Sequence, residues 1–528
     1  MNKLQLCSLY AFLSLTIFSL AACSGSSKWG SIPGKTTLAE VTANNTSACS
    51  SSGQLPAWCQ NYFSGQVDSR NGIATPQYDA AAGNVSDEDI HEYLGQSGSK
   101  TRVFANFMLG FCSDSSSPYC DDNVQTGYTS DDASTIAAQA ADLQRRHIDG
   151  AIMSWEGPGS TEDDATMLFQ AWADHNACSG GKCSLTYTIM DDQPSLGYDV
   201  KSTGIPGTTG QGCSRQGGAA YENCVVQHLR NDICYMNGKD WGNPAYEKIN
   251  GRPVLQIFPD EQIIRVTGPA PSWADVWAQI GSWVQDLPHN CAFAPYNADN
   301  GVPLILFENV EGFTQQASSG SYFWVTPGGT NLDTDQFNYD IAGNSGDTLE
   351  DFLASAHAAN NMVAYSGAYK GFNSIQSTWG TGRIMDQQCG QTWITSLLAG
   401  AINGSGGLPY MQIATWNDYN EGTEIESGID NCYTVSAQTS GSTLFWWLNA
   451  SSSAANLETV SHMEIYDSTD GQDLTLLGSA QPSMNGSWGL SKLAPGKHTL
   501  YVRMVGKNSI LNRITPAVTY STGAAANS

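Results

Sequence analysis

Short apolar runs alternate with longer segments of helical period through the middle of the chain. The first helical segment, residues 130–150, has Ile136, Ala140 and Leu143 on one face. A later segment begins at Ser272 and has Trp277 and Ile280 on one face. Apolar runs separated by amphipathic segments are typical of a βα repeat. The predicted strands occupy residues 101–111, 150–157, 184–192, 252–260, 302–313, 321–327, 362–372 and 410–418.

Eight such steps predict an α/β fold of the (β/α)8 TIM-barrel type, whose chemistry lies at the C-terminal ends of the strands. The chain between residues 313 and 321 is too short for a full helix, so one connection is abbreviated. An open doubly wound sheet is the alternative. It would need a glycine-rich phosphate turn after an early strand, and the sequence has no GxGxxG or Walker-type loop there.

The helical period disappears from about residue 433 onward. Runs such as STLFWWLNAS and KHTLYVRMV alternate with turn residues, and APGKHTLYVRMVG resembles the last hairpin of bacterial immunoglobulin-like modules. A β-sandwich is therefore expected. Carbohydrate binding through exposed aromatics such as Trp446 and Trp447 is one role open to it. A passive spacer is favoured, because at least one of two adjacent tryptophans on a strand must face the core. The predicted segments are a leader at 1–22, a tether and cap at 23–100, a barrel at 101–432 and a sandwich at 433–528.

The N-terminus reads as an export signal. One lysine precedes an apolar stretch too short to span a bilayer permanently, and Leu20-Ala21-Ala22-Cys23 resembles the bacterial lipobox. This resemblance implies that Cys23 is lipidated and that a membrane is a partner through the lipid anchor. We therefore expect a lipoprotein of the bacterial cell envelope, at the outer membrane or cell surface, because Ser24 is not an aspartate.

The cysteine count agrees with export. Of 14 cysteines, Cys7 and Cys23 belong to the leader and anchor, and the remaining 12 form an even number. We expect disulfides, with Cys178 and Cys183 close enough to form a small loop. Short loops of the same kind are open to Cys49 with Cys59 and to Cys112 with Cys120. A metal site is disfavoured, because there is no CxxC and the eight histidines are scattered without ligand spacing.

Net charge and aromatic content restrict the class of molecule that the protein can bind. The chain has 23 Lys and Arg against 50 Asp and Glu, a net charge of −27, which would repel nucleic acid and anionic lipid. A neutral partner fits better. Fifteen tryptophans and 22 tyrosines in an acidic, exported protein suit surfaces that stack on sugar rings.

Acidic, amide and aromatic side chains recur where the predicted strands end. Carboxylates that bind hydroxyl groups, together with aromatic faces, form the mixture that holds a sugar ring. A polysaccharide or oligosaccharide substrate is therefore expected, with no cofactor. The candidate binding residues are Asn106, Trp155, Glu156, Asp191, Asp192, Asp260, Glu308, Glu311, Trp324, Tyr369, Trp416 and Asn417.

Several of these stretches resemble known glycosidases. VFANFMLG is similar to the VFAHFMVG strand of glycoside hydrolase family 71, the α-1,3-glucanases or mutanases, and SYFWVTP resembles that family's FSWxxWP strand. TWNDYNEG resembles TWNDWGES of family 71, while the continuation to GTEIE follows NEWxEGTQIE of the family 99 endo-α-mannosidases and mannanases. The resemblance covers roughly residues 101–430. Asn106 stands where family 71 has histidine, so α-glucan and α-mannan both stay open as substrates.

The resemblance implies that Asp418 and Glu421 are catalytic. Glycoside hydrolysis needs one acid to protonate the leaving oxygen and one carboxylate to assist attack. Two acids three residues apart, in a tight turn after the last strand, suit both tasks. By the resemblance Glu421 is the acid and Asp418 the base-like partner, whereas Glu424 and Glu426 lie past the turn and are rim or structural residues.

Other interpretations remain open on the residues alone. The acids after the last strand also suit a helix cap or a calcium-binding loop. Glu308 and Glu311 form a second pair with the same spacing and are the chief rival for the catalytic role. A noncatalytic, glycan-binding surface lipoprotein is a further alternative, although a pure binder has no need for paired acids.

Overall fold

The computed structural model describes residues 85–95, 100–110, 128–130, 132–192, 218–258, 272–291, 300–325, 348–373, 384–402, 407–419, 421–468 and 474–522. The predicted leader, tether and lipidation site at Cys23 lie outside these ranges. So do Asp260 and the four cysteines between residues 49 and 120. No described helix is both long and apolar enough to cross a membrane.

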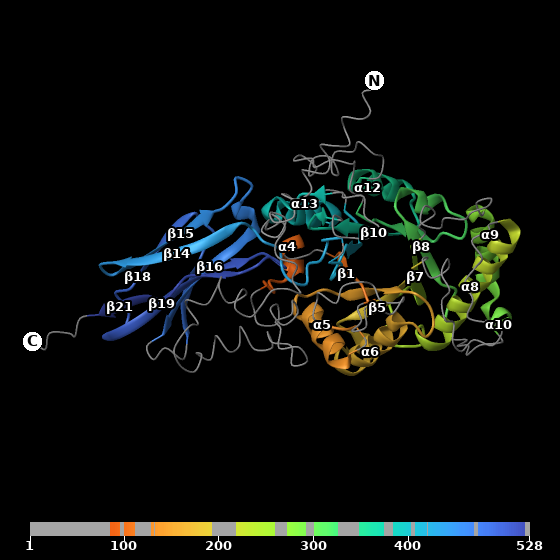
Figure 1. Cartoon of the computed structure of the whole chain (residues 1–528), viewed down its shortest axis with the longest axis horizontal. Helices are drawn as coiled ribbons and strands as arrows, with labels where there is room; N and C mark the ends of the chain where they lie inside the picture. The colour runs from red at the N-terminus through yellow and green to blue at the C-terminus, as the bar shows by residue number, and fades with distance from the viewer. Residues whose placement is uncertain are drawn as a thin grey trace, which may run out of the picture.

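Within the described residues, eight parallel strands close into a barrel at one end of the molecule (Figure 1). Each strand pairs with the next along the chain, and the last pairs with the first, which confirms the predicted (β/α)8 barrel. The strands are β1 (Arg102–Phe107), β2 (Gly150–Trp155), β5 (Thr186–Asp192), β7 (Arg252–Phe258), β8 (Leu304–Glu308), β9 (Gly320–Tyr322), β10 (Val363–Ala368) and β13 (Tyr410–Ile413).

Amphipathic helices cover the outside of the barrel, as their sequence period predicts. Ile136, Ala140 and Leu143 are buried, and the Ser272 side chain caps the helix that buries Trp277. Only a 3₁₀ helix, η4 (Val310–Thr314), joins β8 to β9. The others are α4 (Ile90–Gly95), α5 (Ala133–Arg145), α6 (Thr161–Asn176), α8 (Gly218–Lys239), α9 (Trp273–Trp283), η3 (Val284–Asp286), α10 (Leu287–Asn290), α12 (Leu349–Ala358), η5 (Gln388–Gly390) and α13 (Gln391–Gly400).

Three disulfides join described residues. Cys178 pairs with Cys183, as predicted, between the short strands β3 (Cys178–Ser179) and β4 (Lys182–Cys183). Cys234 of α8 pairs with Cys291 next to α10. Cys389 of η5 pairs with Cys432, and this bridge ties the barrel to the start of the next domain. The remaining short strands are β6 (Lys248–Ile249), β11 (Phe372–Asn373) and β12 (Ile384–Met385).

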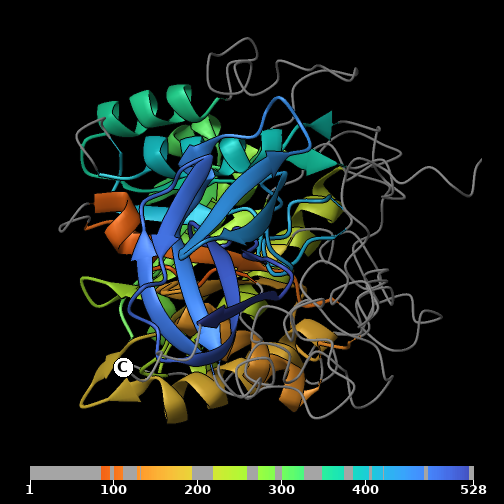
Figure 2. The same cartoon turned by 90° about the vertical axis from the view of Figure 1, so that its left-hand side faces the viewer.

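Antiparallel strands form the other end of the molecule, in front of the barrel in Figure 2. Two sheets enclose a core that includes Trp446 and Met463, so the predicted β-sandwich is confirmed. One sheet contains β14 (Tyr433–Ser440), β15 (Thr443–Ala450) and β18 (Asn485–Gly489). The other contains β16 (Val460–Ser468), β17 (Thr475–Ala480), β19 (Gly496–Gly506), β20 (Arg513–Ile514) and β21 (Val518–Thr522), and η6 (Leu457–Thr459) precedes β16.

The turn between β19 and β20 attaches the sandwich to the barrel. Asn508 in this turn is fully buried, and its Nδ2 donates to the carbonyl oxygens of Glu88 at 2.8 Å and Arg146 at 2.9 Å. Trp393 of α13 donates its indole N–H to the Asn508 carbonyl at 2.9 Å. One asparagine therefore connects three segments that are far apart in the sequence.

Candidate active site

The turn after β13 holds Asp418 and Glu421 together. The backbone N–H of Glu421 donates to Asp418 Oδ1 at 2.9 Å, and the N–H of Asp418 donates to Thr415 Oγ1 at 2.9 Å. Thr415 Oγ1 lies 2.9 Å from Thr423 Oγ1, which closes the turn on itself. An aspartate that accepts a backbone N–H from its own turn has its choice of rotamers restricted by that hydrogen bond. Asp418 is 6% exposed and Glu421 is half-buried, so both acids sit at the edge of solvent.

The next acid along this segment, Glu424, forms a buried ion pair. Its Oε1 lies 2.7 Å from Lys370 Nζ, and both side chains are buried. Lys370 follows β10, so the ion pair fixes the loop after β13 to the loop after the neighbouring strand. A buried ion pair of this kind sets geometry, because either charge left alone would be costly.

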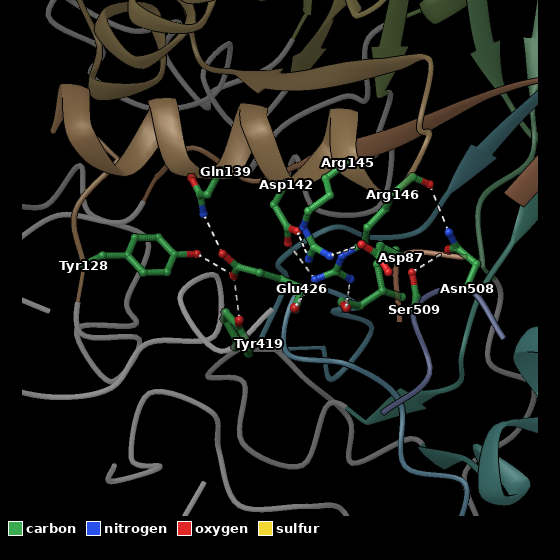
Figure 3. Close-up of polar contacts among 11 residues, drawn as sticks. Asp87, Tyr128, Gln139, Asp142, Arg145, Arg146, Tyr419, Glu426, Asn508 and Ser509 are labelled. Carbon is green, nitrogen blue, oxygen red and sulfur yellow. Dashed lines mark hydrogen bonds and ion pairs between the residues drawn. The ribbon is translucent and has the colours of Figure 1, made fainter. Parts of the chain in front are cut away.

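Glu426 lies in a buried network shown in Figure 3. Its carboxylate accepts hydrogen bonds from Tyr419 at 2.6 Å, Tyr128 at 3.0 Å and Gln139 of α5 at 2.9 Å. Arg146 donates to the Glu426 carbonyl at 2.6 Å. Burial raises the pKa of Glu426 to about 7, and the three donors oppose that shift. These contacts anchor the segment to α5, in line with the structural role expected for it.

Two further acids lie at the interior of the barrel mouth. Glu308 ends β8 and accepts from Asn309 Nδ2 at 2.8 Å, and Asp192 ends β5 and accepts from Ser154 Oγ at 3.3 Å. The pKa of Tyr322 is raised by burial and then by the charges of Glu308 and Asp192. The Tyr322 hydroxyl donates to the Ile257 carbonyl at 2.8 Å, and β7 alone separates the strands β5 and β8 that carry the two carboxylates.

Three amide side chains lie deeper in the barrel. Asn106, Gln256 and Gln412 are fully buried and alternate with residues that pack against the helices. Gln412 Nε2 donates to the Phe323 carbonyl at 2.9 Å, and Asn106 Nδ2 lies 3.6 Å from the sulfur of Met190.

The remaining atoms of these amides have no protein partner. Asn106 Oδ1, Gln412 Oε1 and both polar atoms of Gln256 make no hydrogen bond to the protein. An unpaired buried polar group costs roughly 1–3 kcal/mol, so hydroxyl groups of water or of a ligand are the partners these atoms can take. Sequence reasoning missed Gln256 and Gln412. The available signal was a polar residue at an inward position of an apolar strand, in RPVLQIF and YMQIA.

Aromatic side chains complete the mouth. Trp324 is 9% exposed and meets Phe258 edge-on, with ring centroids 5.2 Å apart. Tyr369 is buried and stacks on Phe323 at 6.0 Å. Both rings belong to the same buried apolar cluster, in which Trp324 is the more exposed of the two.

Two predicted binding residues face away from the barrel interior. The indole N–H of Trp155 donates to Asp163 of α6 at 3.1 Å, and its ring stacks on Tyr235 of α8 at 6.2 Å. Asp191 is fully buried, and the pKa of Asp232 on α8 is raised first by burial and then by the charge of Asp191. Assigning these two to the mouth was wrong, because neighbouring strand residues point to opposite faces. Glu156, next to Trp155, is half-buried.

The residues before Asp418 also need correction. Trp416 is fully buried with the Arg146 guanidinium 4.7 Å from its ring centroid. The Asn417 amide accepts from the Met108 N–H at 2.8 Å and donates to the Met108 carbonyl at 3.0 Å. Both side chains are occupied in holding the loop, so neither is placed to bind a sugar. Glu311, the second member of the rival pair, is exposed on η4.

No group of three or more potential metal ligands occurs among the residues that the structure describes. The acids of the mouth instead combine with amides and aromatic rings. Such a site can bind hydroxyl groups and can donate and accept protons.

No family model matches the chain, and no curated protein is similar to it in sequence. Among solved structures, a family 99 endo-α-mannosidase from Bacteroides thetaiotaomicron is similar at 14% identity, with a TM-score of 0.39, over 62% of this chain and 86% of that chain. A glycoside hydrolase-like protein has 14% identity and a TM-score of 0.40, covering 62% and 87%. A β-glucuronidase from Parabacteroides merdae has 8% identity and a TM-score of 0.35, covering 80% and 48%.

Proposed function

We propose that this protein is a glycoside hydrolase that cleaves an α-linked polysaccharide, as an endo-α-1,3-glucanase of the family 71 type would. The observation that carries the proposal is the turn after β13, in which the Glu421 N–H closes on the Asp418 carboxylate. It presents two acids at the C-terminal edge of a parallel barrel, where barrel enzymes carry their chemistry. Uncharged amides and aromatic rings beside them suit a neutral sugar.

The proposed chemistry assigns a separate role to each acid. Glu421, half-buried, donates a proton to the oxygen of the departing sugar as the glycosidic bond breaks. Asp418, held by a backbone N–H, stays ionised and assists attack at the anomeric carbon. In the direct route its oxygen bonds to that carbon as the bond to the leaving oxygen breaks, and water then releases the sugar. In the indirect route it takes the proton of the attacking water or of a neighbouring sugar hydroxyl. Glu308 and Asp192 bind hydroxyl groups of the sugar beside Tyr322.

Replacement of each acid tests these roles. Glu421→Gln keeps the shape but cannot donate to the leaving oxygen, so kcat on a natural glycan should fall by a factor of roughly 10²–10⁴. Sugars with an activated leaving group should suffer less. Asp418→Asn should be impaired on both kinds of substrate, and Glu308→Gln should chiefly raise KM. The exposed Glu311→Gln is the matched control.

The reverse pattern would overturn the assignment. If Glu308→Gln and Glu311→Gln abolished turnover while the variants at 418 and 421 stayed active, the catalytic pair would lie after β8. The release of reducing ends from α-1,3-glucan and from α-mannan decides the substrate. A second candidate, an α-mannan hydrolase of the family 99 type, is favoured by the NEGTEIE run. Binding to either polymer with no release of reducing ends would identify a noncatalytic surface protein instead.

We also propose that the protein is exported and lipid-anchored through Cys23 in a bacterial cell envelope. The lipobox-like LAAC and the polar stretch after it support this placement. Cys23→Ala should move the protein from the membrane fraction to the soluble fraction in its native host. An unaltered protein that is soluble without detergent would contradict the anchor.

A further inference from the structure

The outward face of the sheet β14–β15–β18 is uncharged. Its three strands are described over their full lengths, and none of the outward-facing positions on them carries an acidic or basic side chain. The whole chain has a net charge of −27, so an extended surface without any charge stands out from the rest. Hydroxyl, amide and aromatic side chains and a glycine occupy these positions.

Two aromatic side chains lie on this face. Phe445 is 39% exposed and Trp447 is half-buried, and both project from the same side of β15. Residues two apart on a strand are about 7 Å apart, so the two rings line up along the strand. Trp446, between them, faces the core and is 2% exposed. A Cβ at Gly486 would lie 2.0 Å from the Trp446 ring, so the glycine lets that ring pack inward.

Neutral polar side chains flank each ring on the neighbouring strands. Gln438 and Ser487 are the cross-strand partners of Phe445, and Ser436 and Asn485 are those of Trp447. Each aromatic ring is therefore bracketed by amide or hydroxyl groups that can donate and accept hydrogen bonds. Aromatic faces beside such groups match the CH-rich faces and hydroxyls of sugar rings.

The other sheet of the sandwich has a different exterior. On β16 and β19, Glu464 lies 3.1 Å from Arg503 Nη1 and 3.5 Å from His462 Nε2. The side of this sheet that faces away from the sandwich core therefore carries charged side chains. The absence of charge is thus specific to one face of the domain.

We propose that the face of β14, β15 and β18 binds one extended chain of a neutral polysaccharide, with Phe445 and Trp447 as the stacking residues. A chain without charge loses no electrostatic energy on meeting an uncharged surface, whereas an anionic polymer would be repelled by the acidic protein around it. The choice of polysaccharide rests on the proposed function. Binding at this face itself does not require hydrolysis.

Retention on polysaccharide tests the proposal in the full-length protein. Glu421→Gln is used as the background so that the polymer is not digested, and insoluble α-1,3-glucan and immobilised α-mannan are the probes. Trp447→Ala and Phe445→Ala are each added to this background, and Trp447→Phe serves as the conservative variant. Leu476→Ala is the control, because Leu476 is 52% exposed on β17 in the opposite sheet.

We expect retention on at least one probe, weakened roughly tenfold by either alanine variant and largely kept by Trp447→Phe and Leu476→Ala. Thermal unfolding should show that Phe445→Ala is folded, because the side chain is exposed. The proposal is overturned if neither probe retains the protein or if both alanine variants are retained like the background. It is equally overturned if Trp447→Ala only converts a dimer to a monomer in size-exclusion chromatography. If the polysaccharide retained the protein but the unaltered protein hydrolysed neither probe, the proposed function would be wrong and the binding face would stand.

Discussion

Acidic residues that are neighbours in the sequence end in different environments. Asp418 and Glu421 share a turn, Glu424 is paired with Lys370, and Glu426 accepts from two tyrosines and an amide. Apart from Tyr419 in the same loop, the partners of the last two acids come from the loop after β10, from α5 and from the residues before α5. A residue's chemistry here depends on which distant side chain faces it, because burial and partners set its charge state.

The first residue-scale prediction concerns pH. The pKa of Glu426 is about 7 in the folded protein, above its ordinary value of 4.5, so the folded state holds the proton more tightly than the unfolded state. The protonated Glu426 therefore contributes fully to the free energy of unfolding below about pH 4.5. That contribution, roughly 3 kcal/mol, is lost as the pH rises to about 7. Glu426→Gln should flatten this part of the pH profile in urea unfolding.

Burial also raises the pKa values of Asp191 and Asp240 to about 7. Glu426→Gln should therefore keep the part of the pH dependence of stability that comes from these two residues. Glu311→Gln, at an exposed position, should leave the profile unchanged. An identical profile for Glu426→Gln and the unaltered protein would show that the carboxyl is already ionised when buried.

The second residue-scale prediction concerns Gln256. Gln256→Leu removes a buried amide that has no protein partner, so the free energy of unfolding should stay equal or rise by about 1 kcal/mol. Substrate binding should weaken at the same time, raising KM roughly tenfold if the amide meets a sugar hydroxyl. Urea unfolding and steady-state kinetics measure the two effects. Gln279→Leu on the exposed side of α9 is the control. Unchanged kinetics with lost stability would assign the amide to internal packing.

At the scale of elements, strand alternation decides which of two neighbouring polar residues enters the mouth. Asp192 accepts a hydrogen bond from Ser154 on the inner side of the barrel, while Asp191 is on the outer side, near Asp232 of α8. The described residues of the loop after β13 form no helix that could hold it. It is held instead by the ion pair to Lys370, by Asn417 against Met108, and by the Glu426 network.

The ion pair between Lys370 and Glu424 gives the prediction at this scale. Lys370→Met should leave a buried carboxylate without its cation and lower the free energy of unfolding by about 3–5 kcal/mol. The double variant Lys370→Met with Glu424→Gln should recover most of that loss, because no buried charge remains. Urea unfolding of both single variants and the double variant measures the coupling. A double variant as unstable as Lys370→Met would mean that packing, rather than charge, holds the loop.

At the scale of the whole molecule, the sandwich is bound to the barrel by covalent and polar contacts. The disulfide between Cys389 and Cys432 and the buried Asn508 both cross the boundary. The segment from Ile429 also pairs with the turn after β19, through the Ile429 N–H and the Ser509 carbonyl at 2.9 Å. Because these contacts are buried or covalent, we expect the two domains to unfold together.

Asn508→Ala tests that coupling. It removes three buried hydrogen bonds, one from the Ser509 hydroxyl and two to the carbonyls of Glu88 and Arg146, so the free energy of unfolding should fall by roughly 2–4 kcal/mol. Calorimetry should then show the single transition broaden or split into two. Asn176→Ala, whose exposed amide bonds to the Trp172 carbonyl, should change stability by less than about 0.5 kcal/mol. A single, unshifted transition for Asn508→Ala would show that the Asn508 amide does not couple the domains.

Local pattern determined the parts of this protein that depend on periodicity. Eight apolar runs and the amphipathic faces between them, such as Ile136, Ala140 and Leu143, specify the barrel, and the loss of helical period after residue 433 specifies the sandwich. The acids at 418 and 421 were also evident, because their spacing and position after the last strand are properties of the chain itself.

Only the tertiary structure decided which side chains meet. Strand twist and closure turn Trp155, Asp191 and Trp416 toward the helices and bring Gln256 and Gln412 into the barrel. On the sandwich, register separates the buried Trp446 from Phe445 and Trp447. The physical reason is that a strand's two faces differ by one residue, and the partners that bury one face come from distant segments that local pattern does not specify.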